Sequence, residues 1–376
     1  MMMKHHLFLV VHDSKDGCSI HRIDVASFDP DDGTADDLDS QAEPLPEPVI
    51  RVEARDSPMH FVALGTKILA LQPSPGGAAP ALDTRTMAIT AGSQPTLDHD
   101  DKNTFCPFVA IGDDRIYGMD MRSGPADLEV LRLGGRCSGG WSWSSVPSPP
   151  PFDPLYVKCY AVHPDERTIF YSLCSSKHMD PAYARDHLRY RDDTGATFSL
   201  DTETLEWAFR GYWRLPFDDG EAHYDAELDA WVGFDNNAGD GRLCSCDVVP
   251  PATGDEDADR RAEAPPTKHC KDRLFRRKGR RRHGGGGLVY MGGSKFCVLE
   301  CATEKRLTGE EFRQVIKMDA RPRLHLYMRT FSLKYSKKGR LRVATCGRRA
   351  RCYCLPEGTA YYPYGDLMQT IRGLWL

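Results

Sequence analysis

Residues 61–70 read FVALGTKILA, an apolar strand, a tight polar turn and a second apolar strand. The same unit returns over residues 108–117, 159–170, 222–232 and 288–298. Apolar runs that flank a short polar turn are typical of β-hairpins. Hairpins that recur at intervals of ~40–50 residues predict the blades of a β-propeller.

Several units carry a second hairpin, over residues 81–87, 198–207 and 331–341. Asp and Thr occupy its turns, where their side chains bond to the backbone two residues on. Two hairpins make one four-stranded blade. With an N-terminal hairpin over residues 6–25, the sequence predicts an all-β fold, a single β-propeller of about six four-stranded blades. Five or seven blades remain open.

A propeller must join its first and last blades without an open strand edge. We expect residues 7–11 to complete a blade begun by strands near residues 341–344 and 351–354, so that the N- and C-terminal strands pair. Residues 308–317 and 180–188 are the best candidates for short helices.

One propeller domain is predicted over residues 5–355, followed by a C-terminal tail over residues 356–376. Residues 27–47 are acidic and rich in proline, and residues 250–286 are a low-complexity charged stretch. Such stretches bury too little apolar surface to offset their ordering entropy. Both are therefore predicted as insertion loops, the second one mobile and projecting from one face.

The chain has 376 residues, 13 cysteines and a net charge of −5. This balance excludes a globally basic nucleic-acid binder, although a local basic patch remains open. An odd cysteine count with irregular spacing favours reduced thiols, and the apolar run at residues 7–11 is too short for a signal core or a membrane span. We therefore expect a monomeric protein of the cytoplasm or nucleus, neither secreted nor on a membrane.

Sequence motifs for catalysis are absent: there is no Gly-x-Ser-x-Gly, Walker A loop, His-Glu-x-x-His or Rossmann glycine pattern. Residues 284–287 are four glycines with no following helix to hold a phosphate, so they predict a flexible spacer. We predict no catalytic residues, no cofactor and no bound metal.

Closely spaced cysteines are candidate zinc ligands, but zinc sites favour two matching Cys-x₂₋₄-Cys pairs. Residues i and i+2 of a strand share a face, where small thiols fill a core. Packing is therefore the favoured interpretation. The candidates are Cys244 with Cys246, Cys352 with Cys354, Cys297 with Cys301, and His269 with Cys270.

Tryptophans and aspartates also allow two interpretations. The tryptophans form either a ligand pocket or the packing between blades, which is favoured because flat rings fill the wedge between twisted sheets. The aspartates are acids for catalysis or, as the strand ends favour, turn caps. His163 and His223, at equivalent places of two hairpins, are a hint of a channel site. The residues concerned are Trp141, Trp143, Trp207, Trp213, Trp231, Asp83, Asp201 and Asp247.

A basic tract runs from residue 271 to residue 282. It is a candidate nuclear-localisation or polyanion-binding segment, and otherwise a solvated loop. Residues 321–351 hold eleven Lys or Arg and no acidic residue, whereas residues 29–39 and 254–259 are acidic, so we expect a bipolar field. The candidate residues of the tract are Arg273, Arg276, Arg277, Lys278, Arg280, Arg281 and Arg282.

Taken together, several segments resemble the grass-expanded plant family of uncharacterised proteins known as domain of unknown function 1668, and more distantly the kelch-like β-propellers. The resemblance implies a propeller and brings no catalytic residues. Only Gly292-Gly293 stands where kelch repeats carry a glycine pair. The segments are residues 141–147, 160–165, 168–170, 197–203, 213–217, 228–233 and 288–292.

The predicted function is a non-enzymatic protein-interaction scaffold that presents loops on a propeller face. We expect a protein partner and no nucleic acid. One alternative is a small-ligand binder or enzyme that uses the central channel. The other is a nuclear or polyanion-binding protein that uses the basic C-terminal region.

Overall fold

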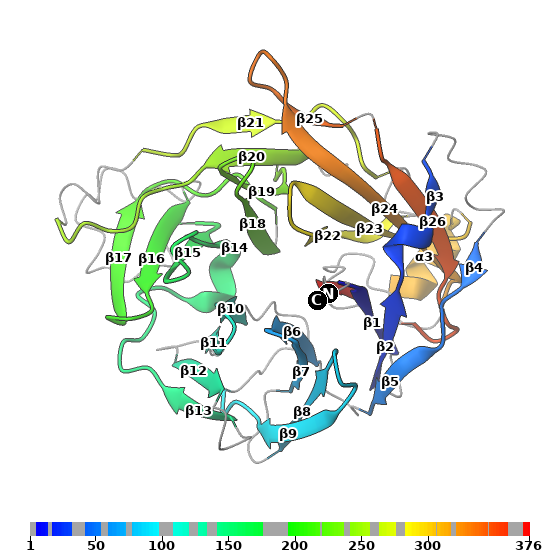
Figure 1. Ribbon diagram of the computed structural model, residues 1–376, viewed down its shortest axis with the longest axis horizontal. Coiled ribbons are helices and arrows are strands. Elements are labelled where there is room, and N and C mark those ends of the chain that lie inside the picture. Colours follow the sequence, from blue (N-terminus) through cyan, green and yellow to red (C-terminus); the bar gives the residue numbers. More distant parts are fainter. Residues whose placement is uncertain are drawn as a thin grey trace. The chain divides into compact units, whose positions relative to one another are not determined.

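The computed structural model is all-β, as the hairpins predicted (Figure 1). By its internal contacts the chain divides into two compact units. Unit 1 comprises Met1–Phe61, Ala238–Arg242 and Cys270–Leu376, and unit 2 comprises Val62–Asn237 and Leu243–His269. The structure describes residues 5–13, 17–31, 42–53, 59–72, 77–97, 108–119, 127–133, 141–175, 195–218, 220–236, 241–255, 263–275, 283–305, 307–316, 321–344, 346–359 and 371–376.

Two sheets of unit 2 are four-stranded meanders whose strand order follows the sequence. Each begins with one of the predicted hairpins, because apolar strands flank a turn at a glycine of positive φ, Gly65 or Gly112. The strands are β6 (His60–Leu64), β7 (Lys67–Leu71), β8 (Ala78–Asp83) and β9 (Ile89–Ser93), then β10 (Val109–Ile111), β11 (Arg115–Met119), β12 (Leu128–Leu133) and β13 (Trp141–Ser145).

The third sheet of unit 2 has eight strands and consists of two four-stranded halves. The halves join where β14 and β18 pair in parallel, with Tyr160 opposite Glu221. A short 3₁₀ turn, Pro154–Tyr156, leads into β14. The strands are β14 (Val157–Val162), β15 (Thr168–Leu173), β16 (Ala196–Asp201), β17 (Glu206–Gly211), β18 (Gly220–Asp225), β19 (Ala230–Phe234), β20 (Leu243–Asp247) and β21 (Thr267–His269).

In unit 1 the two ends of the chain share a sheet of order β27-β1-β2-β5. The N-terminal strand pairs with a C-terminal strand, as predicted, but the predicted partner strands near residues 341–344 and 351–354 are wrong. The partner of β1 is β27, which lies inside the expected tail over residues 356–376. Its sequence, IRGLW, is short but places Ile371 and Leu374 in the core. The strands are β1 (Leu7–Asp13), β2 (Gly17–Ile23), β5 (Pro48–Val52) and β27 (Ile371–Trp375).

The other sheet of unit 1 contains long strands and two very short ones. A 3₁₀ turn (Val25–Ser27) precedes the first of these. The one described α-helix, α3 (Gly309–Ile316), confirms the helix predicted over residues 308–317, whereas residues 180–188 lie outside the described chain. The strands are β3 (Asp29–Pro30), β4 (Glu43–Pro44), β22 (His283–Tyr290), β23 (Lys295–Thr303), β24 (Leu324–Tyr335), β25 (Leu341–Val343) and β26 (Arg349–Cys354).

Parts of both predicted insertion loops belong to the sheets. Within residues 27–47, β3 and β4 pair with the edge of β26. Within residues 250–286, β21 pairs with β20, Leu274 is buried, and the four glycines of the expected spacer lie in β22. Residues 267–269 and 283–286 of the predicted insertion loop are therefore strand rather than loop. Composition missed them because pairing with the backbone of a neighbouring strand makes these short segments strands.

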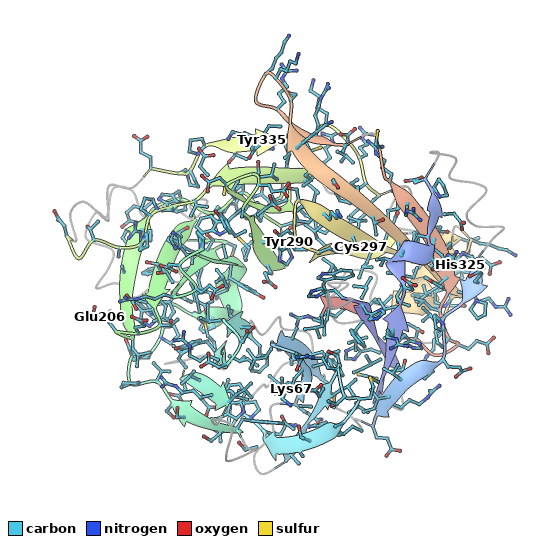
Figure 2. All side chains as sticks on the ribbon, viewed as in Figure 1. Lys67, Glu206, Tyr290, Cys297, His325 and Tyr335 are labelled. Carbon is cyan, nitrogen blue, oxygen red and sulfur yellow. The ribbon has the colours of Figure 1, made fainter. Side chains whose placement is uncertain are left out.

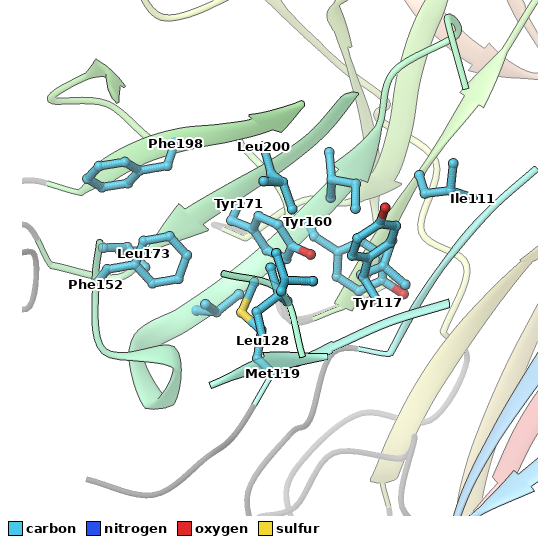
Figure 3. Close-up of a cluster of buried hydrophobic side chains, with 14 of the residues drawn as sticks. Ile111, Tyr117, Met119, Leu128, Phe152, Tyr160, Tyr171, Leu173, Phe198 and Leu200 are labelled. Carbon is cyan, nitrogen blue, oxygen red and sulfur yellow. The ribbon is translucent and has the colours of Figure 1, made fainter. Parts of the chain in front are cut away.

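The largest core cluster of unit 2 lies between the meander β10–β13 and the half-sheet β14–β17. Figure 3 shows side chains from both, among them Tyr117, Leu128, Tyr171 and Phe198. Large apolar side chains on facing sheets interdigitate because each sheet presents alternate residues to its neighbour. These two neighbouring sheets are thus held together by the packing of their side chains.

Candidate functional site

The candidate binding element of unit 1 is the hairpin of β24 and β25, which we call the basic hairpin (residues 333–343). Figure 1 shows its turn projecting beyond the rest of its sheet. The turn is closed by hydrogen bonds, since the N–H of Ser336 donates to Arg340 O at 2.9 Å and the N–H of Gly339 donates to Ser336 O at 2.8 Å. Gly339 has φ 71°, a conformation that favours glycine. The turn is therefore stabilised by its own backbone hydrogen bonds.

Apolar residues anchor the base of the basic hairpin. Leu333, Leu341 and Val343 are buried, and the N–H of Val343 donates to the carboxylate of Asp272 at 3.1 Å. Side chains that carry nitrogen extend from the hairpin beyond Tyr335 (Figure 2). A rigid base thus presents a polar tip.

The basic hairpin has five cationic side chains, and all of them are exposed. None of them makes an ion pair or a side-chain hydrogen bond with another residue that the structure describes. Lys334 lies directly opposite Arg342 in the strand pair, a like-charge arrangement that costs stability. The five are Lys334, Lys337, Lys338, Arg340 and Arg342.

The basic tract predicted from the sequence is a different segment. Of its candidate residues only Arg273 is described, and its side chain is exposed. The others lie outside the described residues, so the structure leaves the targeting hypothesis untested. They are Arg276, Arg277, Lys278, Arg280, Arg281 and Arg282.

A second polar group lies where β14 and β18 meet in parallel. The hydroxyl of Tyr160 lies 3.3 Å from Glu221 Oε2, and Glu221 Oε1 lies 3.7 Å from His223 Nδ1. Lys158, two residues before Tyr160, forms an ion pair of 3.3 Å with Asp218. This row could bind a small polar ligand, because it joins a phenol, a carboxylate and an imidazole on adjacent strands.

His163 and His223 do not occupy equivalent positions, contrary to the sequence-based expectation. His163 lies just after β14, opposite Thr168, and its ring packs near Trp231. His223 lies within β18, opposite Val232. Both turns have four residues, and the residue that corresponds to His163 is Asp225, which pairs with Ala230. The sequence-based alignment of the two histidines was therefore two residues out of register.

The predicted aspartates serve turns and ion pairs. Asp83 accepts from the N–H groups of Arg85 and Thr86 at 3.0 Å each, and Asp201 accepts from the corresponding pair two and three residues on. Partial burial opposes ionisation of Asp83, but these hydrogen bonds prevail and hold its pKa below the usual value. Asp247 instead pairs with Lys268 at 3.1 Å. All three carboxylates therefore have structural partners.

Three of the predicted tryptophans bond to the backbone of the preceding meander or the loop that follows it. The indole Nε1 donates from Trp143 to Ser93 O at 3.1 Å, from Trp207 to Ser148 O at 3.2 Å and from Trp231 to Val162 O at 2.8 Å. Trp213 bonds within its own half-sheet to Arg210 O, and Trp141 packs over Gly92. These contacts favour the packing interpretation over a ligand pocket.

Most of the described cysteines are buried in the cores. Burial raises the pKa of both Cys297 and Cys301 to about 12, and it raises the pKa of Cys244 and Cys246 further. Such thiols stay protonated at neutral pH and fill space. Among the described residues, no group of three or more His, Cys, Asp or Glu is placed to hold a metal ion.

Sequence reasoning missed a serine–histidine pair on β2. His21 Nδ1 lies 2.6 Å from Pro46 O and therefore carries the proton, which leaves Nε2 to accept from the hydroxyl of Ser19 at 2.8 Å. Burial lowers the pKa of His21. The pair ties the proline-rich residues to the sheet. Its only signal in the sequence is a spacing of two residues on one strand.

The acidic residues before β5 neutralise part of the basic C-terminal region. Arg351 on β26 pairs with Asp29 and with Glu43, each at 3.4 Å, and Arg349 donates to Ala26 O and Phe28 O. The predicted bipolar field is therefore reduced at β26 and is left at the basic hairpin. Where the structure describes helices, none has the length and apolar character of a membrane span.

Comparison with known proteins gives one match by sequence. A sequence model of the family DUF1668, described as a protein of unknown function, matches residues 4–353. A comparison with curated proteins gives no match.

Solved structures give only distant likenesses. The chain is similar to the periplasmic gluconolactonase PpgL of Pseudomonas aeruginosa, with 13% identity, a TM-score of 0.45 and coverage of 92% of this chain and 83% of the other. It is also similar to Hsv2 of Kluyveromyces lactis, with 12% identity, a TM-score of 0.39 and coverage of 93% and 85%. Likenesses of this size transfer no activity.

Proposed function

The chain therefore belongs to the DUF1668 family, and we propose that this member is a non-enzymatic protein-interaction scaffold. In this proposal the four-stranded meanders are blades of one β-propeller of about six blades, with β1 and β27 in a shared closing blade. Rigid blades hold surface turns in place, and the turns recognise the partner. The protein acts as a monomer in the cytoplasm or nucleus.

The observation that carries the proposal is the contrast between the candidate catalytic groups and the basic hairpin. The aspartates of the turns are bonded to backbone N–H groups or to a lysine, and the described thiols are mostly buried. The basic hairpin instead offers five exposed cations on an ordered turn. Recognition, rather than bond-making chemistry, is what such a surface supports.

Affinity capture with the full chain, followed by reconstitution with the purified partner, tests the scaffold. We expect a stoichiometric complex with a protein, measured by analytical ultracentrifugation. A chain that forms no complex with any purified candidate, yet turns over a small substrate, would contradict it.

The row of Tyr160, Glu221 and His223 favours a second candidate function, a small-ligand site or an enzyme in the central channel. Glu221→Gln tests this, because the amide keeps the shape of the side chain and removes its charge. A ligand found by thermal shift that stabilises the wild type but not Glu221→Gln would support the second candidate over the scaffold.

A third candidate, a nuclear or polyanion-binding protein, is favoured by the cations of residues 321–351. Heparin binding that weakens steeply with salt would support it.

A further inference from the structure

The basic hairpin carries a cluster of positive charge that no acidic side chain of the described residues neutralises. Its five cations stand against a net charge of −5 for the whole chain, which leaves −10 on the remaining residues. Because the Debye length is about 8 Å at physiological salt, a short anion at the hairpin experiences mainly the local positive charge.

The turn of the basic hairpin is closed by hydrogen bonds that do not depend on a bound anion. Besides the two backbone bonds of the turn, the N–H of Arg340 donates to Ser336 Oγ at 3.2 Å. Binding would therefore cost little backbone entropy. The charge interactions would then contribute to affinity without first having to offset the ordering of the loop. An anion between Lys334 and Arg342 would also relieve their repulsion across the strand pair.

The side chains available on this hairpin restrict the class of partner. Its one aromatic residue, Tyr335, is only half-exposed, so a platform for stacking bases is missing from the tip. The described large apolar side chains that are exposed, Met87 and Ile89, belong to unit 2, so the tip also lacks an apolar residue for insertion into a membrane. Arg and Lys without stacking or apolar neighbours bind carboxylates and phosphates alike, and a partner that is a protein, as proposed above, favours the carboxylates of Asp and Glu.

We propose that the basic hairpin is the docking site for an acidic, carboxylate-rich segment of a partner protein. This inference rests on the proposed scaffold function and names the chemistry of its partner. Arg340 and Arg342 bind carboxylates through paired N–H groups, and Lys334, Lys337 and Lys338 add charge around them.

Fluorescence anisotropy with the full chain tests this. The probe is a labelled peptide of alternating Glu and Ser, about ten residues and ~33 Å long when extended. The comparison peptide has Gln in place of Glu. We expect the Glu peptide to bind and the Gln peptide not to bind, with affinity that falls as salt rises.

A triple charge reversal then locates the site. The affinity for the Glu peptide should fall by about tenfold or more in the triple variant Lys337→Glu, Lys338→Glu and Arg340→Glu. The matched control reverses three exposed cations elsewhere, Arg85, Arg132 and Lys305, with the same change in net charge. The affinity of the control for the Glu peptide should stay within about twofold of that of the wild type. Circular dichroism checks that both variants are folded.

Three outcomes would overturn the inference. The Glu and Gln peptides bind equally; the triple reversal and its control weaken binding alike; or heparin, duplex RNA or vesicles of anionic lipid bind at the hairpin more tightly than the peptide. A captured protein partner that still binds the triple reversal would overturn the hairpin assignment and leave the scaffold proposal standing.

Discussion

The indole N–H of Trp231 on β19 donates a 2.8 Å hydrogen bond to the carbonyl oxygen of Val162, the last residue of β14. Trp231 is fully buried, and its ring lies edge-on to Phe170, with centroids 5.2 Å apart. One side chain thus fixes the end of a strand in the neighbouring half-sheet. Trp207 and Trp143 also donate from the indole N–H to a backbone carbonyl outside their own sheets, so this kind of hydrogen bond recurs along unit 2.

Trp231→Phe removes this bond and leaves a small cavity. We expect a loss of about 2–4 kcal/mol in the free energy of unfolding, from the lost hydrogen bond and lost packing. Urea denaturation measures it. Trp207→Phe is the matched control: its indole is only partly buried, so the loss should be smaller. Equal losses would contradict the expectation that the deeper burial of Trp231 makes its contacts the more stabilising ones.

The tryptophan contacts illustrate how far the sequence could predict this structure. Hairpins such as residues 61–70 were predictable because strand periodicity and turn chemistry are local. The partner of each indole was not, because it is a backbone carbonyl that lies 50 or more residues away in sequence. β27 was missed for a related reason: residues 371–375 contain only three apolar side chains, and pairing with β1 makes them a strand.

The candidate site, too, could be predicted only in part from the sequence. The excess of cations over residues 321–351 was visible in the sequence. Which of them remain without acidic partners depends on tertiary contacts: Arg351 meets Asp29 and Glu43, whereas Lys334 and Arg342 face each other. Charge counting alone could not separate these two groups.

A buried ion pair in unit 1 gives the second prediction. Arg329 Nη2 donates to Glu300 Oε2 at 3.3 Å, and Glu300 is fully buried. Arg329→Met alone should cost about 3–5 kcal/mol, because it leaves a buried carboxylate without this partner. The double variant with Glu300→Gln should recover a large part of that loss. Additive losses in a double-mutant cycle would contradict the coupling.

The third prediction concerns pH. Burial lowers the pKa of His12 from 6.5 to about 4, and the ring lies 3.3 Å from Cys18 Sγ. The folded state therefore disfavours the charged ring, so the stability linked to this group is complete above pH 6.5 and falls as the pH drops toward 4. Between pH 7 and pH 5 the wild type should lose about 2 kcal/mol more than His12→Gln in the free energy of unfolding. Identical pH profiles for the two proteins would show that His12 is not linked to folding.

The fourth prediction concerns the C-terminal strand. The chain end is held by pairing of β27 with β1, by bonds in both directions between His6 and Leu376, and by stacking of His5 on Trp375. Removing residues 371–376 deletes the buried side chains of Ile371 and Leu374, worth about 3–6 kcal/mol together, and leaves an edge of β1 open. We expect a destabilised chain that aggregates more readily, as measured by urea denaturation and light scattering.

A single substitution keeps this prediction testable if the truncated chain does not fold. Ile371→Ala removes one buried side chain and should cost about 2–4 kcal/mol, whereas Arg372→Ala, its half-exposed neighbour on the same strand, should cost less than about 1 kcal/mol. A tail that only lies on the surface would give similar small effects for both. The difference between the two variants therefore decides whether the last residues of the chain belong to the fold.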